Sequence, residues 1–200
     1  RNVLDIQTDG IYHSNKENAA RHQLTITDTG IRMDVIAGTR VLDRSVWGFC
    51  LGTTEELAGK TITLSADFST SRTGSTAVPY LGFFGVDLEP VFTPRDIVTS
   101  QNGGFLPGGS FQTLTYNLEA EEISATYTVT GKETQKYIAV LFAMGNPSKT
   151  TTSIGDWTQW DNIQVEYKDA ATAYQPYACD EFRRSFPTLY GGSFNWNPGV

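Results

Sequence analysis

The stretch WTQWDNIQVEYKDAATAYQPY, residues 157–177, begins as a β-strand and ends in a pattern typical of no regular element. Apolar and polar residues alternate in its first half, which is the period of a strand with one buried face. If Ile163 points into a core, then Asn162 and Gln164 point to the opposite face. Trp160 joins these two amides if the strand is regular that far. The parity therefore predicts an outward row of one indole ring and two amides.

The same alternation recurs upstream and predicts an all-β chain. Residues 61–69, TITLSADFS, alternate strictly, and Asp28-Thr29-Gly30 between two apolar runs predicts a hairpin. Nineteen Gly and eight Pro favour short strands and turns over helices. About eight antiparallel strands with little helix predict a jelly-roll β-sandwich. The expected strands are QLTIT, IRMDVI, SVWGFCL with core Trp47 and Phe49, TITLSADFS, VPYLGFFGVD, FQTLTYNL, ISATYTVT, KYIAVLFAM and WTQWDNIQVEY.

Two segments fall outside this pattern. Residues 89–109 are rich in Pro and Gly and predict a long loop. Residues 178–200 include FPTLYGGSFNWNPGV, which we interpret as a linker and the hairpin start of a following unit. The predicted division is a β-sandwich over residues 1–177 and this extension over residues 178–200. Because the chain begins with Arg1 and carries no secretory pattern, we expect it to be a piece of a longer protein.

Composition excludes several classes of partner. The formal net charge is -7 and the pI about 4.8, which disfavours nucleic acid and anionic membrane surfaces. No apolar run has the ~20 residues of a membrane span, so membrane insertion is not expected. Cys50 is expected to be a small buried residue, and whether it pairs with Cys179 stays open.

Catalytic chemistry is poorly represented. His13 and His22 show no metal-ligand spacing and are expected to be exposed loop residues. No nucleophile motif such as G-x-S-x-G occurs. A glycosidase needs two carboxylates that meet in space, but solvated acids are the preferred interpretation of the candidates, and we expect no enzymatic activity. Those candidates are Asp67, Asp87, Glu89, Asp156 and Asp161.

The aromatic residues indicate a different function. Sugars stack their C–H faces on flat rings and bond their hydroxyls to amides and carboxylates, and GDWTQWDNIQ has that composition. For any single Trp, packing into the core remains an open alternative. The candidate carbohydrate-binding residues are Trp160, Trp157, Asn162, Gln164 and Asp67, with Tyr80 or Tyr137 extending the platform.

The end of the stretch resembles a known motif. WDNIQVEYKDAATAYQPY is similar to the NIQLEEGSTATxYEPY signature of carbohydrate-binding-like jelly rolls in tail and baseplate proteins of phages and prophages of Gram-positive bacteria. NVLDIQTDGIY and LAGKTITLSADFS resemble the opening and one strand of the same modules, and FPTLYGGSFNWNPGV resembles the unit that often follows. The linker VEYKDAATAY departs from the usual acidic-glycine form, and residues 89–109 do not align. The matching positions are Asn162, Ile163, Gln164, Glu166, residues 171–174, Pro176 and Tyr177.

This resemblance implies a non-catalytic module of a phage tail. Such a module would be assembled in the bacterial cytoplasm, reside in the virion and bind polysaccharide at the host cell surface. Other tail subunits are its implied partners, and the full-length protein is expected to be a homo-oligomer. A structural calcium is also implied, with Asp161 as the candidate ligand; no other cofactor is expected. A structural spacer of the tail and an accessory module of a polysaccharide-degrading enzyme remain the alternatives.

Overall fold

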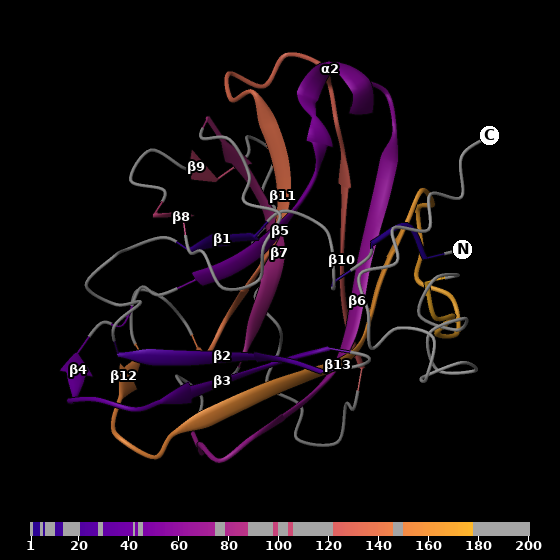
Figure 1. Ribbon diagram of the computed structural model, residues 1–200. Helices are drawn as coiled ribbons and strands as arrows, with labels where there is room; N and C mark the ends of the chain where they lie inside the picture. Colours follow the sequence, from indigo (N-terminus) through magenta and orange to yellow (C-terminus); the bar gives the residue numbers. More distant parts are fainter. Residues whose placement is uncertain are drawn as a thin grey trace, which may run out of the picture.

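The computed structural model describes residues 2–4, 6, 11–13, 21–27, 30–41, 43, 46–74, 79–87, 98–99, 104–105, 122–145 and 150–177. These residues form an antiparallel β-sandwich of jelly-roll type (Figure 1). The predicted strand FQTLTYNL and most of the predicted long loop over residues 89–109 lie outside the described residues. Among the helical segments described, none is long and apolar enough to cross a membrane.

One layer is a five-stranded sheet with the order β10-β6-β13-β3-β2. The predicted hairpin is confirmed, because β2 and β3 pair antiparallel with Ile26 opposite Ile31. β13, which ends the sandwich, lies in the middle of this sheet between β6 and β3. The strands are β2 (His22–Ile26), β3 (Ile31–Val35), β6 (Thr61–Thr70), β10 (Glu122–Thr128) and β13 (Trp157–Glu166).

The second layer is a six-stranded sheet with the order β8-β1-β5-β11-β7-β9. Its ladders are antiparallel except that β1 and β8 pair in parallel. The strands are β1 (Ile11–His13), β5 (Val46–Thr53), β7 (Tyr80–Val86), β8 (Val98–Thr99), β9 (Gly104–Phe105) and β11 (Tyr137–Ala143).

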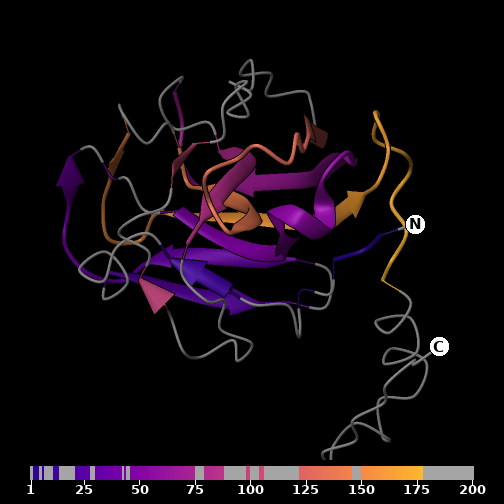
Figure 2. The ribbon, with the colours of Figure 1, turned by 90° about the horizontal axis from the view of Figure 1, so that it is seen from above.

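Three short elements lie at the two ends of the sandwich. The short strands β4 (Arg40–Val41) and β12 (Thr151–Thr152) pair at one end. A single helical turn, α2 (Thr54–Leu57), lies at the other end (Figure 1), which is turned toward the viewer when the molecule is seen from above (Figure 2). Its first turn carries a capping box between Thr53 and Glu56, and Leu57 is buried beneath it. Eight of the described strands have five or more residues, in agreement with the predicted number.

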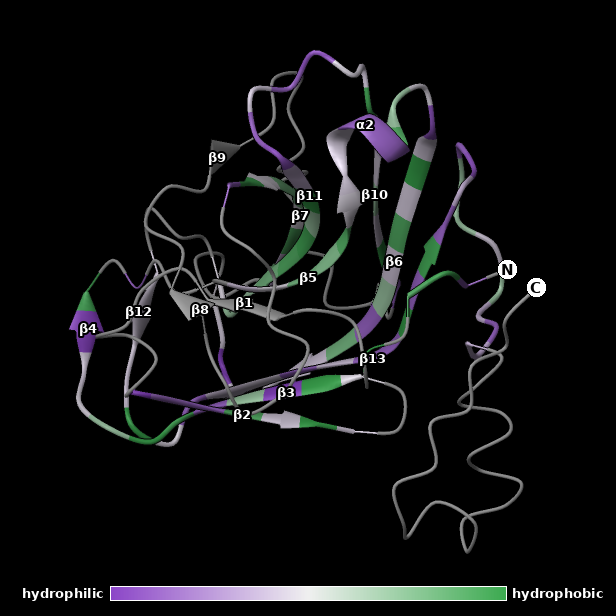
Figure 3. Cartoon of the chain, turned by 45° about the horizontal axis from the view of Figure 1, so that its top comes forward, coloured by the Kyte–Doolittle hydropathy of each residue, from purple (hydrophilic) through white to green (hydrophobic). Residues whose placement is uncertain are grey.

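Apolar side chains from both layers form one core. The alternation predicted for β6 is confirmed: Ile62, Leu64 and Ala66 face the core, and the hydropathy colouring changes from residue to residue along this strand (Figure 3). Trp160 of β13 packs edge-on against Phe142 of β11 with their ring centroids 5.5 Å apart, which joins the two sheets. The predicted core positions Trp47 and Phe49 are buried in the same cluster.

A β-bulge in β13 decides which side chains reach this core. Asp161 lies opposite Asp67, but the next pair is Gln164 with Ser65, so β13 contains one extra residue. Asn162 sits in the bulge with φ 51°, the left-handed region that few side chains adopt. The extra residue shifts the side-chain parity, so Trp160 before the bulge faces the same core as Ile163 and Val165 after it. The predicted outward position of Trp160 is therefore wrong: its side chain is fully buried.

Gly30 allows β3 to approach β13 beside this bulge. A Cβ atom at position 30 would lie 1.8 Å from the carbonyl oxygen of Trp160, well inside van der Waals contact. The obstacle is backbone, so one of the strands would have to move. A residue without a side chain is needed here.

We expect Gly30→Ala to lower the free energy of unfolding by about 3 kcal/mol or more, because the added methyl group collides with the β13 backbone. Gly74→Ala is the matched control: Gly74 has φ 94° and open space around it, so only backbone strain of about 1 kcal/mol is expected. Urea denaturation of both variants measures the difference. Equal losses would contradict the close packing of β3 on β13.

Candidate functional site

The outer face of the five-stranded sheet is polar and crosses all five strands. In the ladder, Trp157 lies opposite Asp34, and Gln159 lies opposite Arg32 on one side and Ser69 on the other. Residues directly opposite each other in a ladder share a face of the sheet. We call this surface the polar face; its members are Gln23, Thr25, Arg32, Asp34, Asp67, Ser69, Glu122, Trp157, Gln159, Asp161 and Asn162.

Trp157 is the aromatic residue of the polar face. Its side chain is half-buried, and the guanidinium carbon of Arg32 lies 4.2 Å from the ring centroid. Asp34 accepts hydrogen bonds from Nε of Arg32 at 3.1 and 3.0 Å and from Nη2 at 2.9 Å, which fixes the guanidinium over the ring. These bonds and the carboxylate charge raise the pKa of Arg32 against the opposing effect of desolvation. The indole is thus held in one orientation by a cation and a carboxylate.

Amides and carboxylates adjoin Trp157 on the same face. Nε2 of Gln159 donates a hydrogen bond to Asp161 at 2.8 Å. Nδ2 of Asn162, in the bulge, donates to Asp67 across the ladder at 2.6 Å. Both carboxylates are half-buried, as are both amides. The predicted residues Trp157, Asn162 and Asp67 are therefore brought to one face, together with Gln159, Arg32 and Asp34, which the sequence reasoning missed. Gln159 has the same parity as Trp157, and that signal could have found it.

Gln164 does not belong to the exposed part of this face. It points outward as predicted, yet residues 168–177, which we call the strap, cover it and leave none of it exposed. Nε2 of Gln164 donates to the carbonyl oxygen of Thr172 at 3.1 Å, and its Oε1 accepts from the Gln175 amide at 2.6 Å. The predicted solvent-exposed row of Trp160, Asn162 and Gln164 is therefore wrong, because a bulge buries the first member and the strap covers the last.

Tyr80 and Tyr137 do not extend the platform. Both lie in the six-stranded sheet, where Tyr80 pairs with Ala143 and Tyr137 pairs with Val86 at opposite ends of the β7–β11 ladder. Both are buried, at 6% and 8% exposure. Their predicted contribution to a surface with Trp157 is wrong, because these strands belong to the other layer of the sandwich.

His22 was expected in an exposed loop and is instead a buried residue of β2. Its Nε2 lies 3.1 Å from Oδ2 of Asp43. The same oxygen accepts a hydrogen bond from the hydroxyl of Thr152 and lies 3.5 Å from Nη1 of Arg21. Next to it, Arg72 donates to the carbonyl oxygen of Met144 at 2.7 Å and pairs with Asp156. Desolvation by burial lowers the pKa of Arg72 despite its acidic neighbours. This network ties β2, β6 and β12 together at the end of the sandwich that carries β4.

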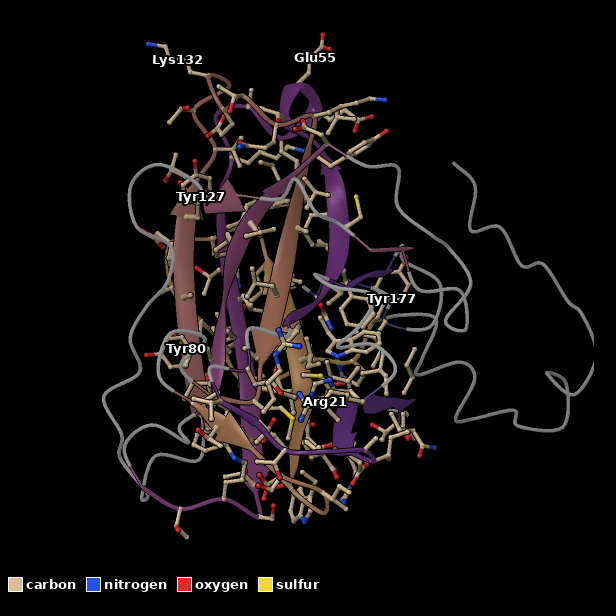
Figure 4. The ribbon with its side chains drawn as sticks, turned by 90° about the vertical axis from the view of Figure 1, so that its left-hand side faces the viewer. Arg21, Glu55, Tyr80, Tyr127, Lys132 and Tyr177 are labelled. Atoms are coloured by element: carbon tan, nitrogen blue, oxygen red, sulfur yellow. The ribbon has the colours of Figure 1, made fainter. Side chains whose placement is uncertain are left out.

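Two further features bear on ligand binding. Within the described ranges, no group of three or more His, Cys, Asp or Glu side chains could hold a metal ion, and the calcium proposed for Asp161 stays a prediction. A cavity of about 400 Å³ lies beside α2, at the end of the molecule that carries Glu55 and Lys132 (Figure 4). It contains none of the predicted binding residues; its lining is Thr53, Thr54, Glu55, Ala58, Gly131 and Lys136.

No protein-family profile and no curated protein matches the chain. Several solved structures are similar to it, among them the following three. The first, described as "CBM4 structure and function", has a TM-score of 0.44 and 13% identity over 80% of this chain and 88% of that one. The second is the N-terminal endo-1,4-beta-D-xylanase 10B of Clostridium thermocellum, with CBM22-1 and GH10 modules and xylohexaose (TM-score 0.41, 14% identity, 85% of this chain and 29% of that one). The third is the xylan-binding module CBM15 (TM-score 0.40, 14% identity, 80% of this chain and 97% of that one). With such scores, these likenesses decide neither the ligand nor the role of this chain.

The most buried carboxylate beside the strap makes the fold sensitive to acid. Burial opposes ionisation of Glu166, but hydrogen bonds from Thr172 and Lys168 outweigh it and lower its pKa to about 2. In the unfolded chain the carboxyl group has an ordinary pKa of about 4.3. The ionised form therefore stabilises the fold fully above pH 4.3, and this contribution is lost as the pH falls towards 2.

We expect Glu166→Gln to be less stable than the native chain at pH 7 by roughly 3 kcal/mol, the free energy equivalent of that pKa difference. The gap should narrow as the pH falls from about 4.3 to 2. Denaturant titrations at several pH values give the measurement. A gap that is independent of pH would show that the ionised carboxylate is not what stabilises the strap.

Proposed function

We propose that this chain is a non-catalytic carbohydrate-binding module and that the polar face is its binding surface. The observation that carries the proposal is the half-buried indole of Trp157, fixed beside amides and carboxylates on the outer face of a rigid sheet. Carbohydrate sites combine a flat ring for the C–H face of a sugar with polar groups for its hydroxyls.

Each group has a distinct role in this proposal. Trp157, with Arg32 stacked on it, offers a flat platform, and the guanidinium adds donors at its rim. Gln159 and Asn162 would donate to sugar hydroxyls, while Asp67 and Asp161 would accept from them. These side chains already bond to one another, so their orientations are set before a ligand arrives, and little conformational entropy is lost on binding.

The charges of the face favour a ligand that is not a polyanion. One guanidinium, from Arg32, accompanies four carboxylates, from Asp34, Asp67, Asp161 and Glu122. Phosphate-rich polymers would meet repulsion there, which adds to the net charge of -7. We therefore infer that sugar hydroxyls, rather than anionic substituents, are the groups recognised.

The setting we propose is the tail of a phage or prophage, where the module would attach to bacterial surface polysaccharide. The similarity of residues 162–177 to the closing signature of tail modules supports this. One flat site binds weakly, and many copies on a virion would multiply the affinity. The same binding role would serve an accessory module of a polysaccharide-degrading enzyme, which the neighbouring genes would distinguish. A calcium ion at Asp161 and homo-oligomerisation of the full-length protein remain part of the proposal.

A structural role in the tail is the second candidate, because one end of the sandwich exposes apolar side chains. Ile36, Val41 and Ile154 are 52%, 71% and 66% exposed. The Gly155 amide donates to the Val35 carbonyl oxygen, and the Val35 amide donates to the Asp156 carbonyl oxygen. Together with the β4–β12 ladder, these bonds bring the three segments to the same end. Clustered exposed apolar residues are typical of protein interfaces. Stable oligomers in light scattering, without any binding to host polysaccharide, would favour this role.

We expect Trp157→Ala to abolish binding to isolated cell walls of the host while lowering stability by only about 1 kcal/mol, from the lost stacking with Arg32. Trp160→Phe is the matched control. It changes a fully buried ring whose indole nitrogen has no hydrogen-bond partner within the described structure, so it should lower the melting temperature but leave binding intact. Cell-wall pulldown and thermal denaturation measure the two effects. Unchanged binding by Trp157→Ala would contradict the proposed surface.

A further inference from the structure

The closing motif of the chain is explained neither by the core nor by the proposed binding surface. Of its residues, Ile163 is buried between the layers and Asn162 reaches the polar face. Gln164, Glu166 and Thr172 do neither. They lie where the strap runs beside β6 and β13, which is visible as the yellow segment in Figure 1.

Glu166 holds the strap at Thr172. The carboxylate is only 1% exposed, and it accepts the Thr172 amide at 3.0 Å and the Thr172 hydroxyl at 2.7 Å. Nε2 of Gln164 donates to the same carboxylate at 2.9 Å, and Nζ of Lys168 lies 3.1 Å from it. A buried carboxylate is stable only when donors surround it in this way. The strap supplies three of these four donors, so its position and the ionised state of Glu166 depend on each other.

The side chain of Gln164 hydrogen-bonds to the backbone of the strap rather than to its side chains. Its amide group accepts the Gln175 N–H and donates to the Thr172 carbonyl oxygen, two contacts that lie three positions apart in the strap. The hydroxyl of Thr63, on the neighbouring strand β6, donates to the carbonyl oxygen of Lys168 at 2.8 Å. The strap is therefore fastened at residues 168, 172 and 175, and small residues such as Ala171 and Ala173 separate the fastening points.

The same part of β13 also holds the opening of the chain. The side chain of Asn2, 3% exposed, donates to the carbonyl oxygen of Ile163 at 3.0 Å and accepts the Val165 amide at 3.0 Å. The Val3 amide donates to the carbonyl oxygen of Val165 at 2.8 Å. Residues 2–3 and the strap thus contact one four-residue segment, residues 163–166, from its edge and from its outer face.

We propose that the closing motif is a seat and strap that fixes how the chain enters and leaves the sandwich. Residues 163–166 are the seat, and the strap is an ordered part of the module that holds the exit beside the entry. The sandwich then ends at Tyr177 in an ordered strap at a defined point, instead of in a flexible tether. A sandwich held in this way keeps its polar face at a constant orientation relative to residues 2–3 and to the strap.

The test is nuclear magnetic resonance on the full 200-residue chain. Residual dipolar couplings of the amides of residues 170–177, Pro176 excepted because it has no N–H, should fit the same alignment tensor as those of β6 and β13. The amides of Thr172 and Gln175 should exchange slowly with solvent. Thr172→Pro removes the N–H that Glu166 accepts, so we expect the couplings of the strap to average towards zero and the protection of Gln175 to fall by at least about tenfold.

Two comparisons make the result decisive. Thr172→Val keeps the N–H and loses only the hydroxyl, so its strap should stay ordered, with a smaller loss of protection. The exchange of β5 and β11 amides reports whether the sandwich itself stays folded in either variant, and cell-wall binding should be unchanged in both. Strap couplings that do not fit the tensor in the native chain, or protection of Gln175 that survives Thr172→Pro in a folded sandwich, would overturn the proposal. If the native chain does not bind cell walls at all, the proposed function is refuted, but the proposal about the strap is unaffected.

Discussion

The structure depends on one extra residue in β13. Without the bulge at Asn162, the strand could not place Trp160 and Val165 on the same side. Either the contact of Trp160 with Phe142 between the sheets or the burial of Val165 in the core would then be lost. The bulge requires a left-handed conformation that costs a non-glycine residue of the order of 1 kcal/mol. Asn is among the residues that best tolerate this conformation, and its side chain gains a hydrogen bond to Asp67. The residue that permits the core is therefore also the one that links β13 to the polar face.

The buried side chains of Asn2, Gln164 and Glu166, near the bulge, are hydrogen-bonded to one another or to backbone. Asn2 satisfies the backbone of β13 where the β3 ladder has ended, and Gln164 and Glu166 satisfy the backbone of the strap. At the end of the sandwich that carries β4, the carboxylate of Asp43 contacts the side chains of His22, Arg21 and Thr152. An unpaired polar group at any of these positions would lower the free energy of unfolding by about 1–3 kcal/mol. These hydrogen-bond networks therefore help to specify the fold. On the outer face of the sheet, the strap therefore covers Gln164 and Glu166, whereas the polar face is open to ligands.

Much of the fold could be predicted from local pattern. The strict alternation of β6, the hairpin at Gly30 and the core aromatics of β5 follow from side-chain period and turn chemistry, which act between near neighbours in sequence. The bulge could not be predicted in this way, because nothing in WTQWDNIQVEY marks the point where the period breaks; a Gly there would have been a signal. The position of the strap could not be predicted either, because in the sequence its partner Gln164 does not differ from an ordinary solvent-exposed polar residue of a strand. For the site, the sequence named Trp157, Asn162 and Asp67 as candidates but its parity argument did not place Trp157 beside Asn162, and their binding role stays a prediction. The expected positions of Trp160 and Gln164 were wrong, because the bulge and the strap change which of these side chains are exposed.

The bulge in β13 is tested most directly by hydroxyl-radical footprinting of the native chain, with the oxidised tryptophans identified by tandem mass spectrometry. Trp157 and Trp160 lie three residues apart in one strand, so a regular strand and a bulged one expose different members of the pair. The account predicts oxidation at Trp157 and protection at Trp160, whose side chain is completely buried. Oxidation of Trp160 at a rate equal to or above that of Trp157 would contradict the bulge. It would also contradict the polar face, which lies on the side of β13 opposite to Trp160.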